Sequence, residues 1–236
     1  MLSAGSGPTR VLLVRHGRTS ANARGLLSGR HDVALDPEGR LQAEAVAAAI
    51  SVRVGGSPVT VVSSPLERAV DTATAILRTC DRAGGTTADQ AGGGGPLVDD
   101  RFIELDYGEW DGIALTEVPP EAWSRWRSDP GFAPPGGETL GSVSVRVAEA
   151  LQDWSGRLQG ETLVVASHVS PIKAAVTWAM GVGDSVTWRL RLSNASICEL
   201  LVDSDPEGRP RPTLVGFNDT AHLVGPEQSA HLVGPE

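Results

Sequence analysis

Short apolar runs recur along the chain, separated by longer stretches in which apolar and polar residues mix. Three runs, at 11–14, 59–62 and 163–166, are four residues long and almost entirely apolar. Runs of this kind are typical of parallel strands that are buried on both faces. Two later strands are expected at 197–202 and 213–216, the second as an antiparallel edge strand.

Helix-start signals lie between the predicted strands. Three of the predicted helices open with a capping residue followed by proline, at Asp36-Pro37, Ser64-Pro65 and Ser170-Pro171. The cap accepts a free N–H group, and proline already has a helical φ. These signals predict helices that reach about residues 50, 80 and 180, and Thr139 predicts another that reaches about residue 158. Alternating strands and helices predict a three-layer α/β/α fold with a doubly wound, mostly parallel sheet.

The composition narrows the classes of function. The formal net charge is −9, whereas a general nucleic-acid binder normally presents a basic face. Cys80 and Cys198 are far apart and lack CxxC or Cys/His spacing, so neither a zinc site nor a disulfide framework is expected. No apolar stretch approaches the ~18 residues of a membrane span. We therefore expect a soluble, cytoplasmic protein that binds neither nucleic acid nor a membrane.

Polar and charged residues follow the first three predicted strands. Segment 15–22 reads RHGRTSAN, segment 63–68 reads SSPLER and segment 167–171 reads SHVSP. Since the carboxyl ends of parallel strands meet at one edge of a sheet, arginines, histidines and two helix N-termini are expected to converge there. Helix N-termini and arginine forks both bind phosphate-like anions. Each residue alone has an ordinary structural explanation, but the three clusters together indicate an anion site.

The segment LLVRHGRTSAN, at 12–22, resembles the signature of the histidine phosphatase (phosphoglycerate mutase-like) superfamily. Further marks of that family follow in order within residues 10–223: SSPLERAVDTA, IELDYGEWDG, PGGET, ASHVSP and NDTAHL. The DYGEWDG, PPGGET and SHVSPIK segments are most similar to the branch of bacterial acid phosphatases and α-ribazole phosphatases. The resemblance implies a phosphomonoesterase that needs neither a metal nor another cofactor.

By this resemblance, His16 is the nucleophile and forms a phosphohistidine, which water then hydrolyses. Glu104 is the general acid and base, with Asp106 and Glu109 as alternatives. Arg15, Arg68 and His168 complete the implied catalytic set. The residues implied to bind the phosphate are Arg15, Asn22, Ser28, Gly29, Arg68, His168 and Val169, the last at a position where many family members have glycine.

Two alternatives share these residues. A cofactor-dependent phosphoglycerate mutase must shield its phosphohistidine from water and generally has a longer insertion before the second histidine. The compact, Gly/Pro-rich segment of this chain favours hydrolysis. A non-catalytic phosphoryl-binding regulator would be expected to lack the nucleophile or the acid. The implied partner is a small phosphate monoester of open identity, and a homodimer also stays open.

The predicted organisation is a single domain at 10–223. A disordered N-terminus is expected at 1–9 and a loose tail at 224–236. The sequence HLVGPE occurs twice near the end of the chain, at 222–227 and at 231–236. A repeat of this length is too short for a solenoid unit.

Residues 112–138 are rich in proline and tryptophan. We predict an insertion with a short helix, placed over the active site. Trp123 and Trp126 are three positions apart and therefore share one face of that helix. Core anchoring is the favoured role for both, and pocket lining is the alternative.

Overall fold

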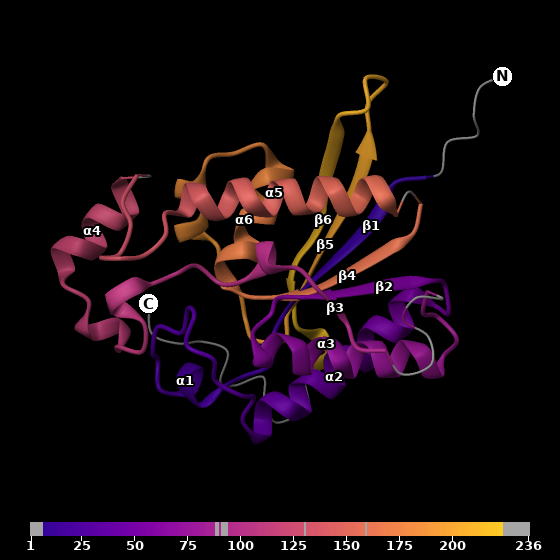
Figure 1. Ribbon diagram of the computed structural model, residues 1–236, viewed down its shortest axis with the longest axis horizontal. Helices are drawn as coiled ribbons and strands as arrows, with labels where there is room; N and C mark the ends of the chain where they lie inside the picture. The colour runs from indigo at the N-terminus through magenta and orange to yellow at the C-terminus, as the bar shows by residue number, and fades with distance from the viewer. Residues whose placement is uncertain (1–6, 88–89, 91–93, 130, 159, 224–236) are drawn as a thin grey trace.

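The computed structural model describes residues 7–87, 90, 94–129, 131–158 and 160–223. A six-stranded sheet forms its centre and has helices on both faces (Figure 1). The strands lie in the order β3-β2-β4-β1-β5-β6. Their bounds are Thr9–Arg15 for β1, Val59–Ser63 for β2, Leu97–Val98 for β3, Thr162–Ser167 for β4, Ile197–Ser204 for β5 and Pro210–Asp219 for β6.

Most strand pairs are parallel. β1 pairs with β4, β4 with β2 and β2 with β3, all in parallel. β5 is antiparallel to β1, and β6 is antiparallel to β5. The predicted mostly parallel sheet with an antiparallel edge is therefore confirmed, and that edge contains two strands. Because β4 lies between β1 and β2, the carboxyl ends of these three strands are neighbours.

Long helices cover both faces of the sheet (Figure 1). Helices α2 (Pro37–Val54) and α3 (Glu67–Arg82) cover one face, and α5 (Leu140–Arg157) and α6 (Val169–Met180) cover the other. The remaining helices are short: α1 (Ser20–Ala23), α4 (Pro120–Ser128) and the 3-10 helices η1 (Asp100–Phe102), η2 (Gly108–Trp110), η3 (Leu115–Glu117), η4 (Asp184–Arg189) and η5 (Ala221–Leu223).

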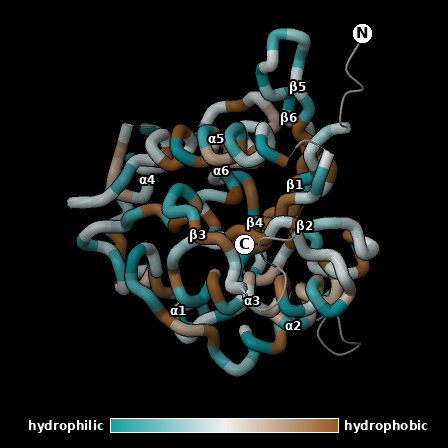
Figure 2. The backbone as a smooth tube through the Cα atoms, turned by 45° about the vertical axis from the view of Figure 1, so that its right-hand side comes forward, coloured by the Kyte–Doolittle hydropathy of each residue, from teal (hydrophilic) through white to brown (hydrophobic). Residues whose placement is uncertain are grey.

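The apolar runs of the sequence enter two cores. Successive side chains of a strand point to opposite faces, so Val11 and Leu13 pack into the core under α5 and α6. Leu12 and Val14 pack into the core under α2 and α3. Figure 2 shows the central strands as the most hydrophobic part of the backbone, whereas the β5–β6 hairpin is mostly hydrophilic at its tip. Burial on both faces explains why these runs are continuous.

Two of the predicted helix starts are confirmed by side-chain caps. Asp36 Oδ1 accepts the N–H of Gly39 at 2.7 Å at the start of α2. Thr139 Oγ1 accepts the N–H of Ser142 at 3.0 Å at the start of α5. Each contact satisfies an N–H group that has no partner within its own helix.

The prediction for the start of α3 was wrong by two residues. Ser64 is not the N-cap, because the helix begins at Glu67 after Leu66. The hydroxyl of Ser64 instead lies 2.7 Å from Nε2 of His168, and it also accepts the N–H of Leu66 at 3.4 Å. A tertiary contact has therefore taken the place of local capping.

The predicted N-cap of α6, Ser170, was also wrong by two residues. The helix begins at Val169, with His168 as its N-cap residue, and Ser170 lies inside the first turn. The N–H groups of Val169 and Ser170 donate to the carboxylate of Glu104, at 3.0 and 3.1 Å. A distant side chain thus provides the cap that we expected from Ser170.

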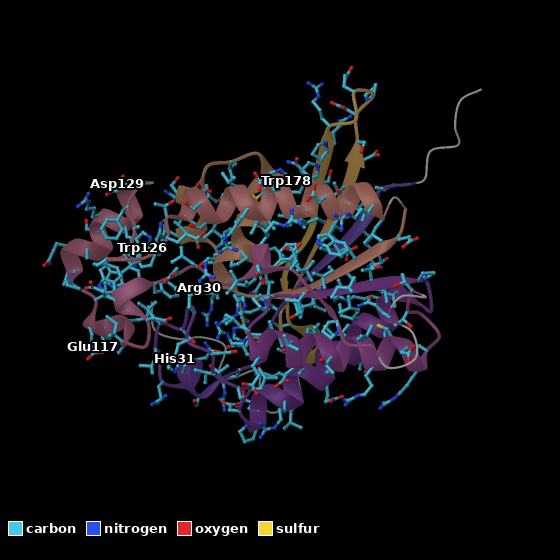
Figure 3. All side chains as sticks on the ribbon, viewed as in Figure 1. Arg30, His31, Glu117, Trp126, Asp129 and Trp178 are labelled. Atoms are coloured by element: carbon cyan, nitrogen blue, oxygen red, sulfur yellow. The ribbon has the colours of Figure 1, made fainter. Side chains whose placement is uncertain are left out.

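Aromatic side chains pack together around α4. Trp126 is buried and stacks on Trp123, with ring centroids 5.5 Å apart, and meets Trp188 edge-on at 5.2 Å. Trp110 and Phe132 lie 5.6 and 6.2 Å from Trp126. Figure 3 shows Trp126 among the side chains around α4. The contacts support core anchoring for Trp126, whereas Trp123 is partly exposed and lines a small hollow beside Leu115 and Arg127.

The ends of the chain lie mostly outside the described residues. This applies to the predicted N-terminus up to residue 6 and to the predicted tail at 224–236. Thr9, at the end of that N-terminal segment, is buried as the first residue of β1. Parts of the Gly-rich stretch before β3, at 88–89 and 91–93, also lie outside. Among the helices that the structure describes, none is both long and apolar enough to cross a membrane.

Candidate active site

The ends of β1, β2 and β4 bring the predicted residues together. The N–H of His16 donates to the carbonyl of Ser167 at 3.0 Å, and the N–H of Ser64 donates to Ala166 at 3.0 Å. The imidazole rings of His16 and His168 lie 5.1 Å apart, centroid to centroid. Three segments that are far apart in the sequence therefore meet at one edge of the sheet, as predicted.

His16 is held as a neutral imidazole with one defined tautomer. Its Nδ1 lies 2.7 Å from the carbonyl oxygen of Gly17. A carbonyl can only accept, so Nδ1 carries the proton and Nε2 keeps its lone pair. Burial lowers the pKa of His16 well below its ordinary value of 6.5, and the charges of Arg68 and Arg15 lower it further.

Gly17 permits a close backbone approach beside this histidine. A Cβ at position 17 would lie only 2.3 Å from the carbonyl oxygen of Gly39. The N–H of Gly17 donates to Thr72 Oγ1 at 3.2 Å. The glycine that follows the histidine is therefore required by packing against α2.

Arg68 is completely buried and nearly saturated with acceptors. Its Nη2 donates to the carbonyls of Ser28 and Gly29 at 3.0 and 2.8 Å, and its Nη1 donates to His31 at 2.9 Å. Its Nε donates to Nδ1 of His168 at 3.3 Å. Four of its five N–H groups are thus used on protein atoms. Arg68 braces the loop at 28–31, and its charge lies directly behind the histidines.

His168 is held by the same network. Because its Nδ1 accepts from Arg68, its proton lies on Nε2 and is donated to Ser64 Oγ at 2.7 Å. Burial lowers the pKa of His168 well below 6.5, with further contributions from Arg68 and His16. Both histidines are therefore uncharged.

Arg15 has more free donors than Arg68. Its Nη1 donates to the carbonyl of Leu192 at 2.6 Å. Its Nε is buried and has no hydrogen-bond partner among the described residues. Burial lowers the pKa of Arg15 to about 10, and the nearby Glu104 opposes this shift. A charged guanidinium with unused donors at the wall of a cleft is suited to an anion.

Glu104 is buried at the start of α6. Its Oε1 accepts from the N–H groups of Leu105 and Ser170, at 2.7 and 3.1 Å, and its Oε2 accepts from Val169 at 3.0 Å. A carboxylate has about four acceptor positions, so one remains on Oε2. Of the three candidate acids, Glu104 lines the cleft, and Asp106 and Glu109 are not among its lining residues. Glu109 is exposed to solvent, and Asp106 accepts the N–H of Gly108.

A cleft of about 770 Å³ opens above His16. Arg68 and His168 lie behind its floor, fully buried. The walls combine polar groups with leucines from several segments. The lining includes Arg15, His16, Arg18, Asn22, Leu26, Leu27, Ser28, Glu38, Gln42, Glu104, Tyr107, Leu115, Val169, Arg191, Leu192, Ser193, Asn194, Thr220 and Leu223.

The residues implied to assist phosphate binding differ in their surroundings. Asn22 and Ser28 line the cleft. The N–H of Gly29 donates to Asp111 Oδ1 at 2.8 Å, and the N–H of Val169 donates to Glu104. A Cβ at Gly29 would lie 2.5 Å from the carbonyl oxygen of Leu105. Phosphate contacts for these residues stay predictions, and the two amide groups already have protein acceptors.

Asn194 was not among the site residues predicted from the sequence. Its Nδ2 donates to the carbonyl of His16 at 3.3 Å and to Oδ1 of Asn22 at 3.1 Å. Oδ1 of Asn22 also accepts the N–H of Thr19 at 3.1 Å. These two hydrogen bonds hold the side-chain oxygen of Asn22, so its amide nitrogen is free to donate to another acceptor. Asn194 precedes the antiparallel strand β5, whereas the site residues were predicted among the residues that follow strands.

The described residues form no cluster that is typical of a metal site. Within the described ranges, no group of three or more His, Cys, Asp or Glu side chains is placed to hold a metal ion. Both cysteines are buried as free thiols, and burial raises the pKa of each to about 11.

The model of the histidine phosphatase superfamily (branch 1) matches residues 11–220. This chain belongs to the histidine phosphatase superfamily. A bifunctional protein of Mycobacterium tuberculosis is 37% identical over 193 residues, which cover 80% of this chain and 49% of that protein. The chain therefore spans about half the length of this and related mycobacterial proteins.

Other relatives match along nearly their whole length. Phosphoserine phosphatase 1 of Hydrogenobacter thermophilus is 31% identical over 218 residues, covering 91% of this chain and 94% of the relative. The solved structure of a mycobacterial glucosyl-3-phosphoglycerate phosphatase complexed with VO3 has a TM-score of 0.72 and 27% identity, covering 89% and 99% of the two chains. The fold is thus that of this superfamily, and the finer α-ribazole branch stays a prediction.

Proposed function

We propose that this chain hydrolyses small phosphate monoesters in two steps, through a phosphohistidine on His16. The observation that carries the proposal is the hydrogen bond from Nδ1 of His16 to Gly17, which leaves Nε2 unprotonated at the floor of the cleft. The lowered pKa keeps the ring neutral and hence nucleophilic. Two of the relatives carry the name of a phosphatase, which supports the same class of reaction.

The first step transfers the phosphoryl group from the ester oxygen to Nε2 of His16. Negative charge spreads over the equatorial oxygens in the transition state. Arg15 offers its unused donors to those oxygens, and the buried charge of Arg68 acts from behind the histidines. Fixed positive groups of this kind stabilise the transition state without reorganisation.

The leaving alkoxide needs a proton, and Glu104 is placed to supply it. Three backbone N–H groups hold its carboxyl group in place. Oε2 accepts only one of these hydrogen bonds, so Oε2 is the atom that would carry the proton. In the second step the same group takes a proton from the water that attacks the phosphohistidine. Asn22, oriented by Asn194, would bind a phosphate oxygen through its amide nitrogen.

The substrate is proposed only as a class. Phosphoserine and glucosyl-3-phosphoglycerate, the substrates in the names of two relatives, are both small phosphate monoesters. We extend that class to this chain without choosing between them.

Steady-state release of inorganic phosphate tests the proposal. The purified chain should hydrolyse 4-nitrophenyl phosphate in the presence of EDTA, and the His16→Ala variant should lose at least about 10⁴-fold in kcat. Turnover that needs a bisphosphoglycerate primer would indicate a mutase. Phosphate binding without turnover would indicate a regulator. Undiminished activity of His16→Ala would contradict the nucleophile assignment.

A further inference from the structure

The segment NDTAH, at 218–222, belongs to a motif that the proposed chemistry does not use. It joins the end of β6 to η5 and lies against the loop at 190–196, which connects η4 to β5. Oδ1 of Asn218 accepts the N–H of Ser193 at 2.7 Å. The contact is made to the backbone of the loop, so it constrains the path of the loop and does not depend on the side chain at position 193.

This loop holds two groups of the proposed reaction. The carbonyl of Leu192 accepts from Nη1 of Arg15 at 2.6 Å. Within the part of the chain that the structure describes, this carbonyl is the one hydrogen-bond partner of the Arg15 guanidinium. The amide of Asn194 donates to the carbonyl of His16 at 3.3 Å, and the N–H of Ala195 donates to the same carbonyl at 3.1 Å. The direction of the Arg15 side chain therefore depends on where the loop lies relative to β1.

The junction of the segment and the loop contains strained backbone. Among the non-glycine residues that the structure describes, only Ala195 and Asn218 have a positive φ, at 52° and 53°. Such backbone persists where the surrounding contacts enforce it, and it concentrates at functional sites. Ala195 is held by its N–H on His16 and by its carbonyl, which accepts from Nε2 of His222 at 2.9 Å. Glycine would adopt the φ of Asn218 more readily. The φ alone thus does not explain an asparagine there, whereas the hydrogen bond to Ser193 does.

We propose that Asn218 is a positioning residue for phosphoryl transfer, which holds the loop so that Leu192 directs the guanidinium of Arg15 toward the phosphoryl group. This inference rests on the proposed function of the cleft. Asn218 is not among the residues that line the cleft, so it acts through Arg15 and not on the substrate. The unused donors of Arg15 stabilise the transition state only while they point at the equatorial oxygens. A shift of about 1 Å in such a group can cost up to about 10²-fold in rate.

Two substitutions at Asn218 separate the hydrogen bond from the backbone. Asn218→Gly removes Oδ1 but adopts the positive φ without strain. It should lower kcat/KM for 4-nitrophenyl phosphate about tenfold, as for a lost hydrogen bond. Asn218→Asp keeps an oxygen acceptor for the N–H of Ser193 and should stay within about threefold of the native value. Val215→Gly is the control: it places a glycine at an exposed position of the same strand and should change kcat/KM less than about twofold. Urea denaturation verifies that each variant is folded.

A double-mutant cycle with Arg15→Ala tests whether Asn218 acts through Arg15. On that background Asn218→Gly should change kcat/KM less than about twofold, whereas a general loss of structure would again cost about tenfold. The proposal would be overturned by native kcat/KM in Asn218→Gly, by an equal loss in Asn218→Asp, or by the same tenfold loss in the absence of Arg15.

Binding of inorganic phosphate gives a readout that needs no turnover and no Arg15 variant. Calorimetry should show a Kd about tenfold weaker in Asn218→Gly than in the native chain or in Asn218→Asp, because Arg15 also binds the oxygens of free phosphate. An unchanged Kd in Asn218→Gly would contradict the positioning role. Failure of the native chain to release phosphate from esters would instead overturn the proposed function, and the Kd comparison would still decide the role of Asn218.

Discussion

The four residues at the centre of the site are almost completely buried, whereas the outer wall of the cleft is partly exposed. His16, Arg68, Glu104 and His168 are at most 4% exposed, and hydrogen bonds fix each of them. The outer wall, at 191–194 and 220–223, includes side chains that face solvent. The centre thus has the fixed geometry that the proposed reaction on phosphate requires. The wall side chains that make no contact with the centre, unlike Asn194, could vary without disturbing the proposed reaction.

After the loss of the nucleophile, the largest effect should follow from removing the proton donor at the centre. Glu104→Gln should lower kcat for glycerol phosphate by about 10²–10⁴-fold, because an alkoxide leaves poorly without a proton. Hydrolysis of 4-nitrophenyl phosphate should fall less than about tenfold, since its leaving group is stable as an anion. Steady-state kinetics on both esters measures the difference.

Glu109→Gln serves as the control for Glu104. Glu109 is exposed, and this variant should match the native chain on both esters. An equal loss on both esters in Glu104→Gln would indicate a structural role at the start of α6. A selective loss in Glu109→Gln would transfer the acid role to that residue.

Acid should destabilise the fold through the histidines whose pKa is lowered by burial. Burial lowers the pKa of His16, His168 and His222 below 6.5. The unfolded chain therefore binds more protons than the folded chain below pH 6.5, and stability falls as the pH drops toward the lowered values. His16 and His168 each contribute up to about 1.4 kcal/mol per pH unit in that window, and the partly exposed His222 contributes less.

Urea denaturation at pH 7.5, 6.5 and 5.5 checks this dependence. His168→Gln should be less stable at every pH but should lose less stability between pH 6.5 and 5.5 than the native chain. The slope is the readout, because a packing defect alone would lower the three values equally. A native chain with constant stability over this range would contradict the neutral histidines.

A smaller effect is expected at the junction of the wall and the centre. Asn194→Ala removes the hydrogen bonds to His16 and Asn22, so kcat/KM for 4-nitrophenyl phosphate should fall about tenfold, as for one or two lost hydrogen bonds. Ser193→Ala, one position earlier on the same wall, should change kcat/KM less than about twofold. Equal kcat/KM values for the two variants would contradict a positioning role for Asn194.

The strands and their carboxyl ends could be predicted because their signals are local. The continuous apolar runs at 11–14 and 163–166 mark strands that are buried on both faces. The polar residues after them, including His16 and His168, follow from the geometry of parallel sheets. The resemblance to a family then supplied the roles of these residues, which spacing alone could not give.

The outer wall could not be found by the same rule. β5 is antiparallel to β1, so residues before β5, and not after it, lie at the edge that holds the site. Strand direction is not encoded in the apolar run at 197–202, and Asn194 was missed for this reason. The cap of α6 was missed because Glu104 is 65 positions from Val169. The local Ser170-Pro171 signal suggested a cap that the fold does not use.

A phosphorylated enzyme intermediate gives the decisive test. We expect rapid acid-free quenching of a reaction with ³²P-labelled phosphoserine or 4-nitrophenyl phosphate to trap label on the protein in an acid-labile, alkali-stable bond. Peptide mapping should assign that label to His16. With 4-nitrophenyl phosphate, whose leaving group needs no proton, Glu104→Gln should accumulate more of the label because water attack is slowed. Label on another residue, or burst-free turnover with no labelled protein in the native chain and in Glu104→Gln, would contradict a phosphohistidine on His16.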